Sequence, residues 1–208
     1  MNPMRVFRSI TCLAFLFICG FAQAQDDEVA KLEAVTKDIL DVLYDDANKG
    51  YTYEQKESAI QSILKQNYDV MILIRRAMGR NWKLLDTEEQ VKFKELVTKL
   101  IVKAYIDGMQ GLERPVIKYG DLVTVTDKRF EIPSVIVFPD GRVFNLMYRF
   151  GRLKSGWQIY DIVAEGVSVV SNYRQQFDDH FRKGNGAELI KKLEDFLEKG
   201  ELDASTKL

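Results

Sequence analysis

Cysteine is nearly absent from this chain of 208 residues. The two cysteines, Cys12 and Cys19, both lie in an apolar N-terminal stretch that we expect to be removed on export. The rest of the chain can then form no disulfide, offer no thiol nucleophile and bind no metal through sulfur. An exported chain of this kind is held together by packing alone.

The N-terminal stretch has the three parts of a cleavable signal peptide: a basic start, a short apolar segment over Ile10–Phe21, and the motif Ala22-Gln23-Ala24. The apolar segment has about a dozen residues, whereas a membrane-spanning helix needs about 20. We therefore expect a signal peptide over residues 1–24, cleavage, and a mature chain that starts near Gln25.

Histidine is also scarce, and basic side chains are slightly outnumbered by acidic ones. His180 is the single histidine, so a usual zinc site is excluded and we expect no metal. Loss of Arg5 and Arg8 with the signal peptide leaves 28 basic and 31 acidic side chains. The sequence has no concentrated basic patch, no phosphate-binding loop, no G-x-S-x-G elbow and no H-E-x-x-H motif. We accordingly expect no nucleic-acid partner and no cofactor.

Hydrophobic residues at helical spacing predict helices over residues 26–48, 52–67, 69–79 and 87–109. Each predicted helix is preceded or opened by a side chain that can cap it. The expected caps are Asp26 or Asp27, Thr52 with Gln55 as a capping box, Asp69, and Thr87 with Gln90 as a second box.

From Val116 the pattern changes to alternation, which predicts four strands over residues 116–126, 130–138, 143–153 and 157–164. Short turns join the later strands, so these strands are antiparallel neighbours. Helices over residues 167–183 and 187–199 follow. The order predicts an α+β fold, a curved four-stranded antiparallel sheet packed by about six or seven helices. We expect one domain over residues 25–200 and a flexible tail over residues 201–208.

One face of this sheet carries more bulky apolar surface than is needed to seat one helix. Phe144, Leu146 and Tyr148 share that face, while Asn145 and Arg149 point the other way. Two interpretations follow: an ordinary core, or the wall of an internal cavity that holds an apolar ligand.

Two acids, Asp161 and Glu165, stand inside an apolar run and invite a catalytic interpretation. On a strand at about 3.3 Å per residue they are about 13 Å apart, whereas glycosidase carboxylates lie about 5–9.5 Å apart. This separation disfavours a catalytic pair. We expect structural roles instead, such as accepting backbone hydrogen bonds or pairing with Arg149 or Arg174, with Gly166 allowing the turn into the next helix.

The run WQIYDIVAEGVSVVSNYRQQF, Trp157–Phe177, resembles the signature of the MlaC family, also called toluene-tolerance auxiliary transport proteins. The segment Met78–Val97, the PDGR turn at Pro139–Arg142 and the glycine break near Gly184 agree with the same family. The resemblance covers nearly the whole mature chain, apart from a diverged first helix and tail.

The resemblance implies a soluble periplasmic phospholipid carrier and not an enzyme. Family members hold phospholipid by its acyl chains in a cavity between a curved sheet and helices. They shuttle it between an outer-membrane lipoprotein–porin complex and an inner-membrane ABC transporter, which hydrolyses the ATP, and so maintain outer-membrane lipid asymmetry.

Alternation along the strands and helical spacing supply our candidate lipid-binding residues. They are Ile132, Ile136, Phe144, Leu146, Tyr148, Tyr160 and Ile162 from the sheet, Leu100, Ile101, Ala104 and Tyr105 from the long helix, and Val167 at the strand-to-helix corner, with Arg149 near the cavity mouth.

Two other classes stay open from the sequence. One is a hydrolase or isomerase on a scaffold like that of nuclear transport factor two, with Asp161 or Glu165 as base on an apolar substrate. The other is a structural or chaperone-like protein whose apolar stripes are all core.

Overall fold

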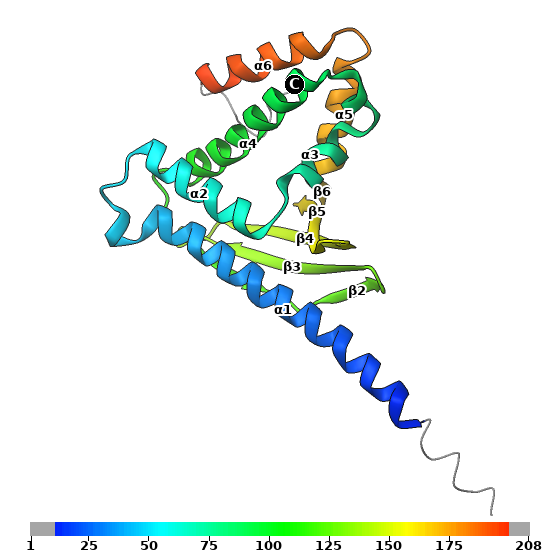
Figure 1. Cartoon of the computed structure of the whole chain (residues 1–208). Coiled ribbons are helices and arrows are strands. Elements are labelled where there is room, and N and C mark those ends of the chain that lie inside the picture. Colours follow the sequence, from blue (N-terminus) through cyan, green and yellow to red (C-terminus); the bar gives the residue numbers. More distant parts are fainter. Residues whose placement is uncertain (1–10, 200–208) are drawn as a thin grey trace, which may run out of the picture.

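The computed structural model describes the backbone of residues 11–199 and the side chains of residues 27–199. Within that range the fold is α+β, as predicted, with six α-helices and an antiparallel sheet (Figure 1). The elements in chain order are α1 (Thr11–Tyr44), the 3₁₀ helix η2 (Asp46–Asn48), α2 (Tyr53–Asn67), α3 (Val70–Met78), the 3₁₀ helix η3 (Gly79–Leu84), α4 (Thr87–Met109), β1 (Val116–Tyr119), β2 (Val123–Thr126), β3 (Arg129–Val137), β4 (Val143–Leu153), β5 (Gly156–Ala164), β6 (Val167–Ser168), α5 (Val169–His180) and α6 (Gly186–Lys199).

Two of the predicted helix starts are confirmed by their caps. The Thr52 hydroxyl accepts from the Gln55 N–H, and the Gln55 side chain accepts from the Thr52 N–H, which forms the predicted capping box. At the start of α3 the Asp69 carboxylate accepts from the Met71 N–H at 3.0 Å. Both caps satisfy N–H groups that the first helical turn leaves without partners.

The predicted caps of two other helices are wrong, although α4 does span the predicted residues. The capping box of α4 is formed by Asp86 and Glu89, one residue before Thr87 and Gln90. The Gln90 amide instead donates to the carbonyl oxygens of the preceding turn. The described part of α1 also begins well before Asp26 and runs through it without a break. The first ten residues of the expected signal peptide and the expected tail over 201–208 lie outside the described residues.

The sheet has six strands in the described chain, not the predicted four. The first predicted strand is broken into β1 and β2, which pair with successive parts of the same edge of β3. The break lies opposite Pro133, whose nitrogen has no hydrogen to donate across the sheet, while Gly120 N–H donates to the Pro133 carbonyl oxygen at 2.8 Å. The sixth strand is the short β6, which follows β5 through a two-residue turn at Glu165 and Gly166.

A bulge in β5 changes which side chains share a face. Phe150 pairs with Ile159 and Tyr148 pairs with Ile162, so Tyr160 is the extra residue between them. Its ring lies over the backbone of Gly151, whose face of β4 is opposite to that of Phe150. The predicted alternation is therefore interrupted at Tyr160.

Buried side chains form two apolar clusters. The first joins the inner face of the sheet to α1, α2 and the end of α4, with Phe130 stacked on Phe150 at 4.7 Å and edge-on to Trp157 at 4.7 Å. The second joins α3, the start of α4, α5 and α6, with Phe93 edge-on to Phe177 at 5.6 Å. In Figure 1, α1 runs along the sheet, α4 and α6 lie above α2, and α3 and α5 stand over the end of the sheet near β5 and β6.

Candidate functional site

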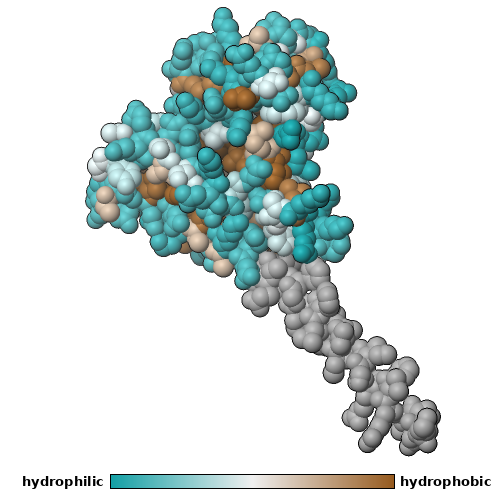
Figure 2. All heavy atoms as spheres, viewed as in Figure 1, coloured by the Kyte–Doolittle hydropathy of each residue, from teal (hydrophilic) through white to brown (hydrophobic). Residues whose placement is uncertain are grey.

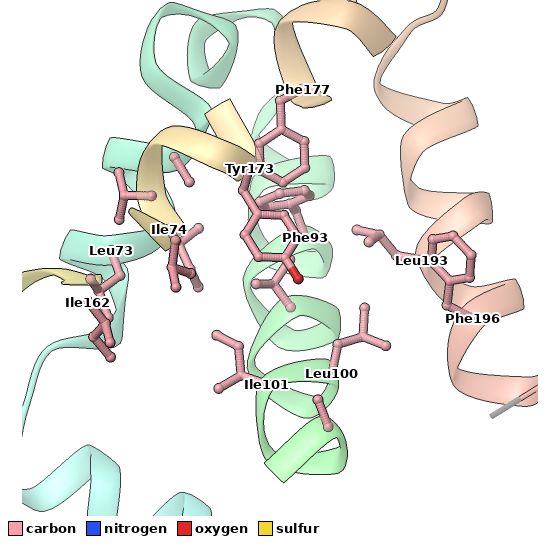
Figure 3. Close-up of a pocket in the computed structure, with 15 residues that line it drawn as sticks. Leu73, Ile74, Phe93, Leu100, Ile101, Ile162, Tyr173, Phe177, Leu193 and Phe196 are labelled. Atoms are coloured by element: carbon pink, nitrogen blue, oxygen red, sulfur yellow. The ribbon is translucent and has the colours of Figure 1, made fainter. Parts of the chain in front are cut away.

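An apolar pocket of about 200 Å³ lies between α3, α4, α5, α6 and β5. Figure 3 shows Ile74 and Ile162 on one side of it, Phe196 on the other, and α4 running behind. The full set of lining residues is Leu73, Ile74, Ala77, Phe93, Val97, Leu100, Ile101, Ala104, Ile162, Val169, Val170, Tyr173, Phe177, Leu193 and Phe196.

Helical spacing places the lining residues of each helix on one face. On α4 the lining residues recur at three- and four-residue steps from Phe93 to Ala104, which places them along one face. On α5, Val170, Tyr173 and Phe177 are spaced in the same way. The pocket is the space that these faces leave between them where they meet β5 at Ile162.

The lining carries a single polar group, the phenol of Tyr173, and no charged side chain. Burial raises the pKa of this phenol above its ordinary value, so it stays neutral. Ile101 and Tyr173 remain 42% and 39% exposed, which marks the side on which the pocket opens. Figure 2 shows apolar side chains gathered at the centre of the visible face, with hydrophilic residues around them. Such a pocket can hold an apolar group, but its lining offers no acid, base or nucleophile of ordinary reactivity.

Four of the candidate residues line this pocket. They are Leu100, Ile101 and Ala104 on α4, and Ile162 on β5. Through these four residues, α4 and the sheet meet at one apolar pocket. Contact of these side chains with lipid stays a prediction.

Six other candidates lie elsewhere. Ile132 and Tyr148 are buried in the first cluster, and Tyr105 and Leu146 pack against it. Desolvation by burial raises the pKa of the Tyr105 and Tyr148 phenols above the ordinary value. The remaining two lie at exposed positions: Phe144 is 42% exposed at the end of the sheet, edge-on to Phe138, and Val167 is 58% exposed in β6.

Ile136, which pairs with Ile117 and Phe144, is half-buried near the same end of the sheet as Phe144. It does not line the pocket. The apolar face of the sheet therefore extends beyond the pocket without belonging to it.

Two candidates lie on the opposite face of the sheet. The bulge places Tyr160 there, with the guanidinium groups of Arg76 and Arg129 at 4.7 and 5.7 Å from its ring. Arg149 pairs with Glu131 at 2.9 Å and with Asp161 at 3.1 Å. Arg149 thus takes part in an ion-pair network and is not among the lining residues of the pocket, and its expected position near a cavity mouth stays a prediction.

Sequence reasoning missed the lining residues of α3, α5 and α6. Their apolar spacing was visible in the sequence, but it predicts only that a helix has a buried face. Which buried faces border an open space depends on how α3 and α5 pack relative to α4 and α6, and no local pattern encodes that arrangement.

Asp161 is buried, and its carboxylate has three hydrogen-bond partners. It is 5% exposed, and its carboxylate accepts from Arg149 at 3.1 Å, from the Ser168 hydroxyl at 2.7 Å and from the Val170 N–H at 3.2 Å. Ser168 in turn caps α5 by accepting from the Ser171 N–H. The carboxylate therefore joins β4, β5 and the positive start of α5, where a negative charge is favourable.

Glu165 has different partners. It lies in the turn between β5 and β6 with φ of +47°, followed by Gly166 with φ of +80°. Its carboxylate accepts from the backbone N–H of Asn145, and its own N–H donates to the Asn145 carbonyl oxygen at 3.0 Å. The carboxylates of Asp161 and Glu165 therefore have separate sets of hydrogen-bond partners.

Within residues whose side chains are described, no group of three or more His, Cys, Asp or Glu side chains is placed to hold a metal ion. In the same part of the chain, no helix combines the length and the apolar character needed to cross a membrane.

The α+β fold and the uncharged pocket define a protein that can enclose an apolar group. The family model described as MlaC protein matches residues 33–195, and the chain belongs to the MlaC family. Among solved structures, a phospholipid-binding protein from Ralstonia solanacearum, in complex with a phospholipid, is similar over 80% of this chain and 94% of that chain, with 21% identity and a TM-score of 0.66. At that identity the likeness shows a shared fold. A search among curated proteins gives no match.

Proposed function

We propose that this protein is a periplasmic phospholipid carrier. In this proposal it is exported through a cleaved signal peptide and moves lipid between an outer-membrane lipoprotein–porin complex and an inner-membrane ABC transporter, which maintains outer-membrane lipid asymmetry. The observation that carries the proposal is the pocket between α3, α4, α5, α6 and β5, lined by fourteen apolar side chains and Tyr173, in a chain of the MlaC family.

The energetics of an acyl chain explain why such a pocket suffices. Each methylene removed from water contributes about 0.8 kcal/mol, so a chain of sixteen carbons gains on the order of 12 kcal/mol. A lipid with this penalty in water needs a shield to cross an aqueous compartment. The shield needs no reactive group, and the carboxylates of Asp161 and Glu165 are occupied by structural partners.

The direct test is lipid content. The full chain is expressed with its leader, recovered from a periplasmic extract without detergent, and studied by native mass spectrometry and lipid extraction. We expect a chain that begins near Gln25 and carries phospholipid. A protein that stays free of lipid, even after incubation with phospholipid vesicles, would refute the carrier function.

A pair of variants on α4 makes the test specific to the pocket. Ile101 lines the pocket and is 42% exposed, whereas Val91 is 56% exposed on the same helix and does not line it. Ile101→Glu places a charge where an acyl chain would lie, and we expect at least a tenfold loss of bound lipid, since a buried unpaired carboxylate is costly. Val91→Glu is the matched control and should retain lipid. Equal lipid content in the two variants would contradict the assignment of this pocket.

A further inference from the structure

A second, polar cleft lies beside the apolar pocket. It has a volume of about 640 Å³ and is formed by the end of α2, the start of α3 and the middle of α4. Its lining differs from that of the pocket, because lysine, glutamine, asparagine and threonine side chains contribute to it.

The cleft and the pocket share two helices. On α4, Lys94 and Thr98 line the cleft, whereas Val97 and Ile101 line the pocket. Lys94, Thr98 and Ile101 follow one another at four- and three-residue steps, so they are neighbours on the helix surface. On α3, Val70 and Met71 line the cleft, and the next turn, with Leu73 and Ile74, lines the pocket. One amphipathic molecule can therefore reach both.

The charges of the cleft favour an anion. Lys65, Lys94 and Lys99 line it, all three are exposed, and none has an ion-pair partner among the described residues.

Two acids also line the cleft. The Asp69 carboxylate is engaged at the start of α3, where it accepts from the Met71 N–H at 3.0 Å. Glu95 is exposed on α4 and offsets part of the positive charge. Three ammonium groups against two carboxylates leave a net positive cleft whose lysine donors are not used within the chain.

We propose that this cleft binds the phosphate of a phospholipid headgroup while an acyl chain occupies the adjacent pocket, and that its three lysines favour headgroups of net negative charge over zwitterionic ones. The inference rests on the proposed carrier function and adds a headgroup preference to it. A zwitterionic headgroup presents its own ammonium to the lysines, which weakens the attraction that its phosphate gains.

The experiment measures competition between two headgroups. Purified protein is incubated with vesicles that contain equal amounts of isotope-labelled phosphatidylglycerol and phosphatidylcholine with identical acyl chains, separated from the vesicles, and extracted for lipid analysis. The variant is Lys65→Gln, Lys94→Gln and Lys99→Gln combined. The matched control combines Lys83→Gln, Lys154→Gln and Lys191→Gln, which replace exposed lysines that do not line the cleft.

We expect wild-type protein and the control to prefer phosphatidylglycerol by about threefold or more, since an exposed charge pair contributes up to about fivefold. The cleft variant should take up the same total lipid with a preference near one, and added salt should lower the wild-type preference towards that value.

Three outcomes would overturn the proposal. The first is a wild-type protein without headgroup preference, and the second is a cleft variant that keeps the full preference. The third uses soluble glycerophosphoglycerol: if it binds to the protein while the lipids show no preference, the cleft belongs to a free phosphodiester. Uptake of neither lipid by wild-type protein would instead refute the carrier function itself, which separates the two failures.

Discussion

Replacement of Asp161 by asparagine tests whether this acid is structural. The carboxylate accepts from the side chains of Arg149 and Ser168 and from the Val170 N–H, and it is 5% exposed. One carboxylate oxygen accepts from Arg149 and from the Ser168 hydroxyl, and the other accepts from the Val170 N–H. In Asp161→Asn the amide oxygen can replace only one of them, and the amide nitrogen, which is a donor, then faces the donor or donors of the other. The variant also removes the negative charge that pairs with Arg149.

The magnitude follows from the burial of the pair. Removal of one partner from a buried ion pair costs about 3–5 kcal/mol. Arg149 keeps its contact with Glu131 at 2.9 Å, and its side chain is 33% exposed, so water relieves part of the loss. We therefore expect a decrease of about 2–4 kcal/mol in the free energy of unfolding, which for a domain of this size lowers Tm by about 4–16 °C.

Thermal unfolding followed by circular dichroism measures this decrease, and Glu165→Gln is the control. Glu165 is exposed, and a glutamine oxygen can still accept from the Asn145 N–H, so this variant should lose less than about 1 kcal/mol. Below its Tm, Asp161→Asn should still carry lipid. Equal Tm values for the two variants, or a fully stable Asp161→Asn that has lost lipid, would refute the structural role.

Two further tests address the packing of the helices and the burial of Glu28 in α1. In Gly186→Ala the added methyl group would meet the Glu89 carboxylate, whereas in Gly108→Ala it meets no atom within 4 Å. Denaturant unfolding should show a loss of about 0.5–1 kcal/mol for the first, because the Glu89 carboxylate must move and give up its hydrogen bond from the Asp86 N–H, and a gain of about 0.5–1 kcal/mol for the second. The opposite order would contradict the packing of α4 on α6. Burial raises the pKa of Glu28 above 4.5, more than its ion pair with Lys31 lowers it. The native state then holds this proton more tightly than the unfolded state, so stability falls as pH rises from about 4.5 through the raised pKa. Glu28→Gln should gain stability at neutral pH and none below pH 4.5 in the same assay; an equal gain at both values would exclude this cause.

Much of the fold could be predicted because local signals decide it. The Thr52–Gln55 box and the Asp69 cap set helix starts through contacts within one turn, and alternation placed β3, β4 and β5. The break between β1 and β2 was less visible. The sequence analysis predicted one unbroken strand there, and only the register shows that this strand breaks near Gly120, opposite Pro133.

The site was harder to predict than the fold. Strict alternation placed Tyr160 beside Ile162, and one bulge moved it to the other face. Leu100, Ile101 and Ala104 were found because α4 is long and its apolar stripe is plain. The contributions of α3, α5 and α6 depend on the distance between helix pairs, which is a property of the assembled fold.

The location of the pocket has a physical reason. The bulky inner face of the sheet is already covered, since Phe130, Phe150 and Trp157 are in ring contact beneath α1 and α2. The pocket therefore meets the sheet only at Ile162 and is otherwise built from α3, α4, α5 and α6. Helices and paired strands satisfy their backbone N–H and C=O groups among themselves. An opening between their faces therefore sacrifices only contacts between side chains, and those are the contacts that an acyl chain can replace.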